Sequence, residues 1–194
     1  MKENDIESFC PKNRQQWRKW LQKNHDKKKS VWLIYYKKES NIPTITWSDA
    51  VDEALCFGWI DSQRKSIDES KFMQRFSQRK ANSIWSKINK QKIDQLIKDG
   101  FMTTAGMKCV EVAKENGSWS VLDEVEELII PEDLNEAFKK KPGSKKYFLS
   151  LSKSRRKLLL FRLMNAKQQE TRAKRIREIV MVHSSSVQGS KFVV

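Results

Sequence analysis

Two acidic residues in the first third of the chain, Glu53 and Asp61, are candidates for acid–base chemistry. Glu53 directly precedes the segment ALCFGWID (54–61), and Asp61 is its last residue. In this segment an apolar run is followed by a glycine, a tryptophan and an acid. Two carboxyl groups in different surroundings can serve as the acid and the base of one reaction. Because Asp61 follows Trp59 closely, apolar walls would enclose it in a pocket. The pattern therefore makes both carboxylates catalytic candidates, with no reaction assigned.

A structural role explains the same residues. Asp49, Asp52, Glu53 and Cys56 recur at helical spacing and share one helix face. Such an acidic stripe is typical of the solvated side of an amphipathic helix. Asp61 likewise suits the polar face of an ordinary strand. The sequence leaves both interpretations open.

A second group, in RFSQRKANSIWSKIN (75–89), has the composition of an anion site. Its two arginines precede a helix that Asn82 or Ser83 would cap. The first N–H groups of a helix are free, and together with guanidinium and hydroxyl groups they bind phosphate or carboxylate oxygens. The residues predicted to line a ligand pocket here are Trp47, Trp59, Arg75, Arg79, Ser83, Trp85 and Asn89. The alternative is a capped helix with two surface arginines.

The charge of the chain is concentrated near its end. Of 194 residues with a net charge of +15, residues 135–194 hold 16 Lys and Arg against three Asp and Glu. This balance favours anionic partners. We predict weak, sequence-tolerant binding of a polyanion such as nucleic acid by Arg155, Arg156, Lys167, Arg172, Lys174, Arg175 and Arg177. The alternative is a solvated face of a helical bundle, with Arg172 or Arg175 bridging to acids.

The cysteines and short motifs indicate neither a metal nor a cofactor. Cys10, Cys56 and Cys109 form no C-x-x-C pair and no zinc pattern. Cys56 has no histidine nearby in sequence, which favours a buried structural thiol over a nucleophile. Neither glycine-rich nucleotide-binding motif occurs. With no membrane-spanning stretch and no secretion signal, we expect a cytoplasmic protein, whose oligomeric state stays open.

The elements that must position these residues form an α+β fold. We expect a small antiparallel sheet packed with helices over residues 1–120, a basic helical C-terminal module over 131–182 and a mobile tail over 183–194. The predicted strands cover 31–38, 59–67 and 71–77. The predicted helices cover 13–24, 47–57, 82 or 83 to about 98, 103–115, 133–140, 152–164 and 166–182.

Local sequence fixes some of these boundaries. Thr46 and Asp49 form a helix start, and Gly58 stands where a left-handed helix cap is needed. The predicted hairpin carries Arg64 and Arg75. If these are cross-strand neighbours, their repulsion requires an acid or a bound anion nearby.

Several separated motifs resemble one known family. ITWSDAVDEALCFGWIDSQRKSID, RFSQRKANSIWSKIN and AKQQETRAKRI are together similar to the bacterial YdeI/OmpD-associated family, also labelled bacteriocin-protection proteins, over about residues 10–182. The family's motif positions correspond here to Trp47, Glu53, Gly58, Trp59, Asp61, Arg79, Ser83, Trp85 and Asn89. The chain departs from the pattern at Ser62, where glycine is usual, and at Ser77-Gln78, where Thr-Pro precedes the arginine.

Three functions are consistent with the sequence. The resemblance implies an accessory protein of bacteriocin or stress resistance, which would act by binding an anionic partner or ligand. The alternative is a small-molecule enzyme with a carboxylate as acid or base and an arginine anion clamp, in a pocket between GWID and Arg79–Trp85. The third is a structural partner protein whose charged clusters are internal ion pairs.

Overall fold

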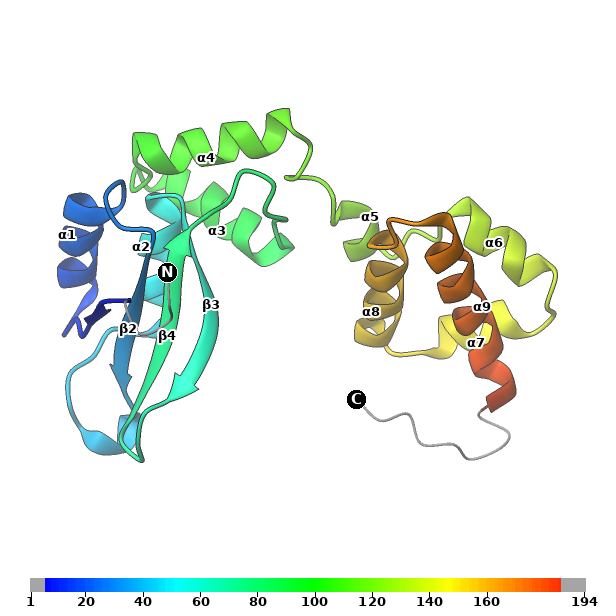
Figure 1. The fold of residues 1–194 in the computed structure, drawn as a ribbon, viewed down its shortest axis with the longest axis horizontal. Helices are drawn as coiled ribbons and strands as arrows, with labels where there is room; N and C mark the ends of the chain where they lie inside the picture. The colour runs from blue at the N-terminus through cyan, green and yellow to red at the C-terminus, as the bar shows by residue number, and fades with distance from the viewer. Residues whose placement is uncertain (1–5, 186–194) are drawn as a thin grey trace. The chain divides into compact units, whose positions relative to one another are not determined.

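The computed structural model describes residues 6–185 of the chain, which divides into two compact units, one ending at Val121 and the other beginning at Leu122 (Figure 1). We call them the N-terminal unit and the C-terminal unit and describe each by itself. The predicted α+β class is confirmed, because the N-terminal unit contains a four-stranded sheet and the described part of the C-terminal unit is helical.

The sheet contains β1 (Ser8–Phe9), β2 (Ser30–Tyr36), β3 (Trp59–Ser66) and β4 (Lys71–Gln78), in the order β1-β2-β4-β3. The predicted hairpin is β3–β4, and β2 pairs antiparallel with β4. The additional strand β1 runs parallel to β2. Two residues are too few to show the alternation by which a strand is recognised in sequence. The expected antiparallel sheet therefore has one short parallel strand at its edge.

The two hairpin arginines are not opposite each other. A bulge between Asp61 and Arg64 shifts the register, so Arg64 pairs with Gln74, while Arg75 lies opposite Trp32 of β2. A bulge places two residues of one strand against one of its partner, which no alternation pattern reveals. The cross-strand repulsion considered from the sequence therefore does not arise.

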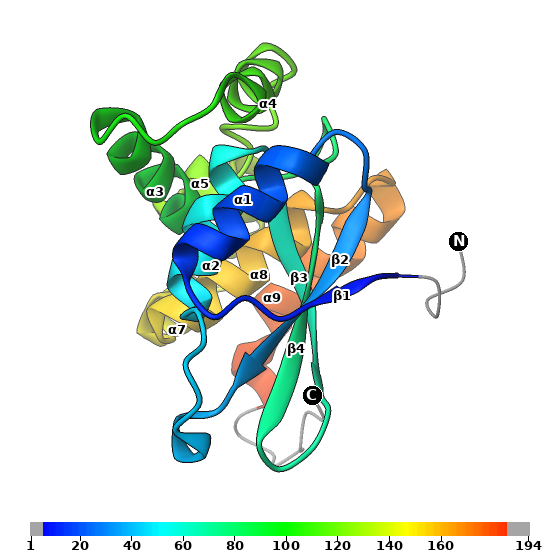
Figure 2. The ribbon, with the colours of Figure 1, turned by 90° about the vertical axis from the view of Figure 1, so that its left-hand side faces the viewer.

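Four α-helices complete the N-terminal unit, namely α1 (Arg14–Asn24), α2 (Trp47–Cys56), α3 (Lys87–Lys98) and α4 (Thr104–Glu115), with a 3-10 turn, η2 (Lys38–Ser40), after β2. Each α-helix begins at a polar side chain that accepts a hydrogen bond from the backbone N–H three residues later, the caps being Asn13, Thr46, Ser86 and Thr103. Figure 2 shows α1 and α2 side by side against one face of the sheet.

The core of the N-terminal unit joins α1 and α2 to the sheet. Trp17 of α1, Leu33 of β2, Leu55 of α2 and Phe76 of β4 are almost completely buried. Trp17 also donates its indole N–H to the backbone oxygen of Ala50 at 3.0 Å, so its polar atom is satisfied inside the core. This packing holds α1 and α2 against the sheet.

The predicted start of α3 at Asn82 or Ser83 is wrong. The helix begins at Lys87, and the side chain of Ser86 caps it by accepting from the N–H of Asn89. Trp85, which fits the helical spacing, instead lies in an irregular segment and is 1% exposed. Burying this large ring in the core outweighs one more helical turn.

Helix α4 lies very close to the end of α2. Thr103 donates its hydroxyl (2.6 Å) and its backbone N–H (3.2 Å) to the backbone oxygen of Cys56. A Cβ atom at Gly106 would lie only 2.3 Å from the same oxygen. The contact therefore requires glycine, and it holds α4 beside the turn that contains Gly58 (φ +71°), the predicted left-handed cap.

The described part of the C-terminal unit contains α5 (Asp123–Glu126), α6 (Glu132–Lys139), α7 (Ser144–Ser150), α8 (Lys153–Met164) and α9 (Gln169–Ser185). Its core includes Leu134, Phe138, Phe148, Leu160, Leu163 and Ile179. The helices α6, α8 and α9 were predicted, whereas α5 and α7 are too short to show a clear period. Of the predicted mobile tail, residues 183–185 belong to α9 and residues 186–194 lie outside the described residues.

Between residues 6 and 185, no helix has both the length and the apolar character needed to cross a membrane. The same residues bring together no group of three or more His, Cys, Asp or Glu side chains that could hold a metal ion.

Candidate functional site

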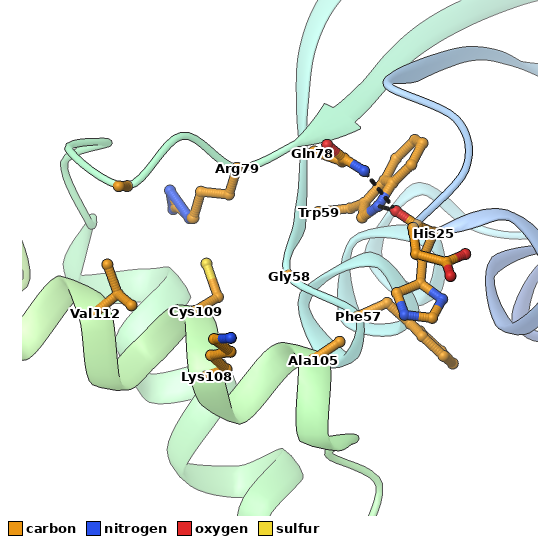
Figure 3. A pocket seen from close by; sticks show the side chains of 12 residues that line it. His25, Phe57, Gly58, Trp59, Gln78, Arg79, Ala105, Lys108, Cys109 and Val112 are labelled. Carbon is orange, nitrogen blue, oxygen red and sulfur yellow. Dashed lines mark hydrogen bonds between the residues drawn. The ribbon is translucent and has the colours of Figure 1, made fainter.

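A cavity of about 370 Å³ lies in the N-terminal unit where α2 passes into β3 (Figure 3). Four segments that are distant in sequence form it: residues 25–26 after α1, residues 57–59 at the start of β3, residues 78–81 at the end of β4, and one side of α4. Its volume is within the range of about 300–1,000 Å³ that is usual for small-molecule sites.

Arg79 provides a positive charge at the cavity wall. Its backbone N–H donates to the oxygen of Gly58 at 2.9 Å, which carries the β3–β4 pairing one residue past the strand and fixes the start of the side chain. The guanidinium lies 3.6 Å from the centre of the Trp85 ring. Stacking on tryptophan suits this planar, weakly hydrated cation.

No acid of the described residues forms an ion pair with Arg79. One terminal nitrogen donates to the oxygen of Ile84 at 3.5 Å, and the buried Nε has no partner among the described residues. Burial lowers the pKa of Arg79 to about 10, because the charged form loses water, and the Asp61 carboxylate opposes this effect only in part. The group is still a cation at neutral pH, and it has no ion-pair partner among the described residues.

The facing wall is a stripe of α4. Ala105, Lys108, Cys109 and Val112 follow one another at the spacing of a single helix face and all line the cavity. In Figure 3 the Cys109 sulfur points toward the segment that carries Arg79. Burial raises the pKa of this thiol, an effect that Arg79 partly opposes. Cys109 is therefore a neutral thiol at neutral pH and not an activated nucleophile.

Gly58 leaves the middle of the cavity without a side chain. A Cβ atom at this position would lie 3.2 Å from Cβ of Cys109 and 3.3 Å from the backbone oxygen of Ala105, and its φ of +71° disfavours other residues. The glycine thus meets two requirements, the end of α2 and the close approach of α4. It also leaves backbone, with no projecting group, between the two ends of the cavity.

The opposite end of the cavity contains His25 and Asp26. The backbone oxygen of His25 accepts from the indole N–H of Trp59 (3.1 Å) and from the side-chain amide of Gln78 (2.8 Å). The His25 ring lies 5.3 Å from that of Phe57. These contacts attach the end of α1 to both strands of the hairpin and hold His25 at the rim.

The two catalytic candidates are in different places and neither lines the cavity. Glu53 is 2% exposed and binds Arg14 (2.5 Å) and Arg18 (2.7 Å) of α1. Asp61 accepts from the indole N–H of Trp47 (3.1 Å) and from the amide of Gln74 (3.2 Å). Glu53 is therefore not part of a solvated acidic face, as one interpretation of the sequence held. Its partners are about 35 residues away in sequence, beyond the reach of helical spacing.

Of the seven predicted ligand-binding residues, the structure brings Trp59 and Arg79 to the cavity. Trp85 stacks on the guanidinium of Arg79. Ser83 belongs to a turn in which its N–H donates to the oxygen of Lys80. The remaining three, Trp47, Arg75 and Asn89, lie elsewhere: at the start of α2, on β4 and in the first turn of α3.

Among the cavity residues that sequence reasoning missed are His25, Asp26, Lys108 and Cys109. The helical spacing of Ala105, Cys109 and Val112 is present in the sequence, but the same spacing is typical of a helix face that packs into a core. The turn at Asp26 carries no motif. Only the pairing of the hairpin with the end of α1 brings these segments together.

Part of the predicted polyanion-binding set is engaged within the C-terminal unit. Arg172 binds both oxygens of Asp133, at 2.5 and 2.9 Å, and this contact lowers the pKa of Asp133. Arg175 donates to the backbone oxygen of Arg162. Bridging by Arg172, the alternative drawn from the sequence, is thus observed. The rest of the set forms no ion pair with a described residue and consists of Arg155, Arg156, Lys167, Lys174 and Arg177.

Two family models match the chain. Residues 9–109, just over half of the sequence, match the model described as a domain of unknown function, DUF8412. Residues 127–182 match the model described as bacteriocin-protection, YdeI or OmpD-associated, which supports the suspected family over this stretch, the one that contains AKQQETRAKRI. The GWID segment and Arg79 fall within the first match. No curated protein and no solved structure matches the chain.

Proposed function

We propose that this chain, which belongs to the family described as a domain of unknown function, DUF8412, binds a small anionic ligand in the cavity beside Arg79. The observation that carries the proposal is the half-buried guanidinium of Arg79, whose Nε has no partner and which forms no ion pair with a described carboxylate. A link to bacteriocin or stress protection and a cytoplasmic location belong to the same proposal.

The energetics of Arg79 support a ligand. A buried charge is costly unless it is paired, and proteins normally pair it. Here the described residues offer a stacking contact with Trp85, one long hydrogen bond, and the charge of Asp61 from beyond ion-pair distance. A carboxylate or phosphate entering the cavity would supply the missing charge and accept charge-assisted hydrogen bonds. Lys108 lines the same cavity and adds a second positive charge.

Replacing Arg79 with glutamine is expected to weaken binding of an anionic probe about 10- to 100-fold, the loss of one charged hydrogen-bonding group. The probe is caproate, whose carboxylate and short apolar tail match the cavity. Binding is measured by an amide NMR titration, in which the signals of Gly58 and Arg79 report the site. The folded protein should keep its stability, because the substitution also removes a desolvated charge.

The matched control is Arg64→Gln, which removes an exposed arginine that stacks on Phe72 outside the cavity. It should bind caproate like the unmodified chain. Equal affinities of the Arg79 and Arg64 variants, or shifts confined to residues far from Gly58, would contradict the proposal.

The acid–base enzyme is less well supported by the geometry. Glu53 and Asp61 are absent from the lining of the cavity, and each is engaged by two donors. The thiol of Cys109 lines the cavity together with Arg79, and burial raises its pKa. These facts favour binding over catalysis at this site.

A second candidate function, polyanion binding, is favoured by the first two turns of α8. They carry Lys153, Arg155, Arg156 and Lys157, with no acid in the first turn. Positive side chains at a helix N-terminus are unfavourable, because the helix dipole is positive there. Lys157 alone among them has an ion-pair partner in the described chain, Glu126. Such an arrangement costs stability, and a bound polyanion would relieve it.

Replacing Lys153 and Arg155 together with glutamine is expected to weaken binding of a generic single-stranded oligonucleotide and to reduce the slope of log affinity against log salt by about 1.4, roughly 0.7 for each lost phosphate contact. Both residues are exposed on α8. Fluorescence anisotropy across a salt series measures the slope. The control replaces Lys87 and Lys98 of α3 in the same way. Identical slopes for the two double variants would rule out a role for the start of α8.

A further inference from the structure

We infer that the ligand of the Arg79 cavity is an elongated zwitterion, with a carboxylate at Arg79 and an ammonium group at the opposite end, beside Asp26. The inference rests on the proposed function and names the chemical class of its ligand. A free ω-amino carboxylate and a short peptide with both termini free share this chemistry.

The cavity has two ends of opposite character. Arg79 and Lys108 contribute positive charge at one end. In Figure 3 these two side chains lie on one side of Gly58 and His25 lies on the other. Asp26, which also lines the cavity, follows His25 directly in the chain. The charge therefore changes sign along the cavity.

The groups at the His25 end accept hydrogen bonds. Nδ1 of His25 lies 3.0 Å from the backbone oxygen of Leu21, and a carbonyl oxygen only accepts, so Nδ1 carries the proton. In the neutral ring Nε2 is then an acceptor. The Asp26 carboxylate is exposed and forms no ion pair with a described residue. An ammonium group is the ligand group that either acceptor would bind, and the negative charge of Asp26 favours it further.

Of the three lysines that follow Asp26, one already has a partner. Lys28 is paired with Glu7 at 3.0 Å. The backbone N–H groups of Lys27 and Lys28 both bind the oxygen of Asn24, which closes the turn and leaves the Asp26 carboxylate outside it.

The middle of the cavity selects the body of the ligand. Gly58 presents backbone there, and Phe57, Ala105 and Val112 add apolar wall. An α-amino acid carries its two charges on neighbouring atoms and cannot place them on both sides of Gly58. A chain of several methylene groups or peptide units can.

The test compares probes of matched length on the full chain by amide NMR titration at low salt. Caproate has only the carboxylate, hexylamine only the ammonium group, and ε-aminocaproate has both. We expect ε-aminocaproate to bind about fivefold more tightly than caproate, the gain of one exposed ion pair. Glycine, with adjacent charges, should bind no better than acetate.

Asp26→Asn should remove the advantage of ε-aminocaproate and leave the affinity for caproate unchanged, whereas Asp94→Asn, at an exposed acid of α3, should leave both unchanged. Equal affinity of the unmodified chain for caproate and ε-aminocaproate would overturn the zwitterion. Failure of caproate and ε-aminocaproate alike would instead overturn the proposed function.

Triglycine and its N-acetylated form separate the two sources of the ligand. Tighter binding of triglycine than of ε-aminocaproate, lost on acetylation, identifies a peptide with a free N-terminus. The opposite order identifies a free ω-amino carboxylate. Both orders support the zwitterion. It is contradicted if acetylation leaves triglycine binding unchanged and caproate and ε-aminocaproate bind equally well.

Discussion

Gly106→Ala should lower the free energy of unfolding by about 3 kcal/mol, the upper part of the usual range for overpacking a tight contact. Helix propensity predicts the opposite sign, since alanine in a helix interior is favoured over glycine by about 1 kcal/mol. The contact decides, because the new Cβ atom would lie 2.3 Å from the backbone oxygen of Cys56 and 2.7 Å from its carbonyl carbon. Backbone atoms at the end of α2 cannot move aside as a flexible side chain does.

The expected displacement also breaks hydrogen bonds. The oxygen of Cys56 accepts from both the hydroxyl and the N–H of Thr103, so moving α4 away stretches the cap of α4 and the end of α2 together. Because Cys109 and Lys108 lie on the next turn of α4, caproate binding should weaken as well.

Urea unfolding followed by circular dichroism measures the effect. Glu111→Ala, an exposed position of α4, is the control and should change stability by less than about 0.5 kcal/mol. A rise in stability for Gly106→Ala would show that α2 and α4 are not in contact at this point.

Glu53→Gln should lower the free energy of unfolding by about 3 kcal/mol, the lower end of the cost of removing one partner from a buried ion pair. The lower end applies because Arg14 and Arg18 are 33% and 26% exposed, so water screens part of their charge. The Glu53 carboxylate is 2% exposed and uses one oxygen for each guanidinium. Glutamine keeps the shape of the side chain and removes its charge.

Without Glu53, Arg14 keeps one ion pair, with Asp49 at 3.6 Å, and Arg18 keeps only its hydrogen bond to the backbone oxygen of Phe101. Like charges four residues apart on a helix repel. Asp49→Asn is therefore the control, and its effect should stay below about 1 kcal/mol, as for other exposed pairs. Thermal and urea unfolding of both variants give the comparison. Unchanged stability of Glu53→Gln would return Glu53 to the catalytic candidates.

Local sequence determined most of the elements of the N-terminal unit. The cap of α2 at Thr46 and the turn after it at Gly58 depend on hydrogen bonds and backbone angles within a few residues. The local sequence is therefore enough to predict both. The β3–β4 hairpin follows from two short runs and one turn. The same local rules misplaced the start of α3, because Asn82, Ser83 and Ser86 are all competent caps and only the burial of Trp85 selects the last.

The tertiary structure alone decided the candidate site. Arg79 was recognised from its place in a motif, but its lack of a counter-ion depends on which acids the fold brings near it. Glu53 appeared solvated because its partners Arg14 and Arg18 belong to another helix. His25, Gly58, Arg79 and Cys109 meet because backbone and side-chain hydrogen bonds join the end of α1, the hairpin and α4 across more than 80 residues of chain. The periodicity of a sequence indicates which face of a helix or strand is buried. It does not indicate which other elements that face contacts, and the chemistry of a site depends on those contacts.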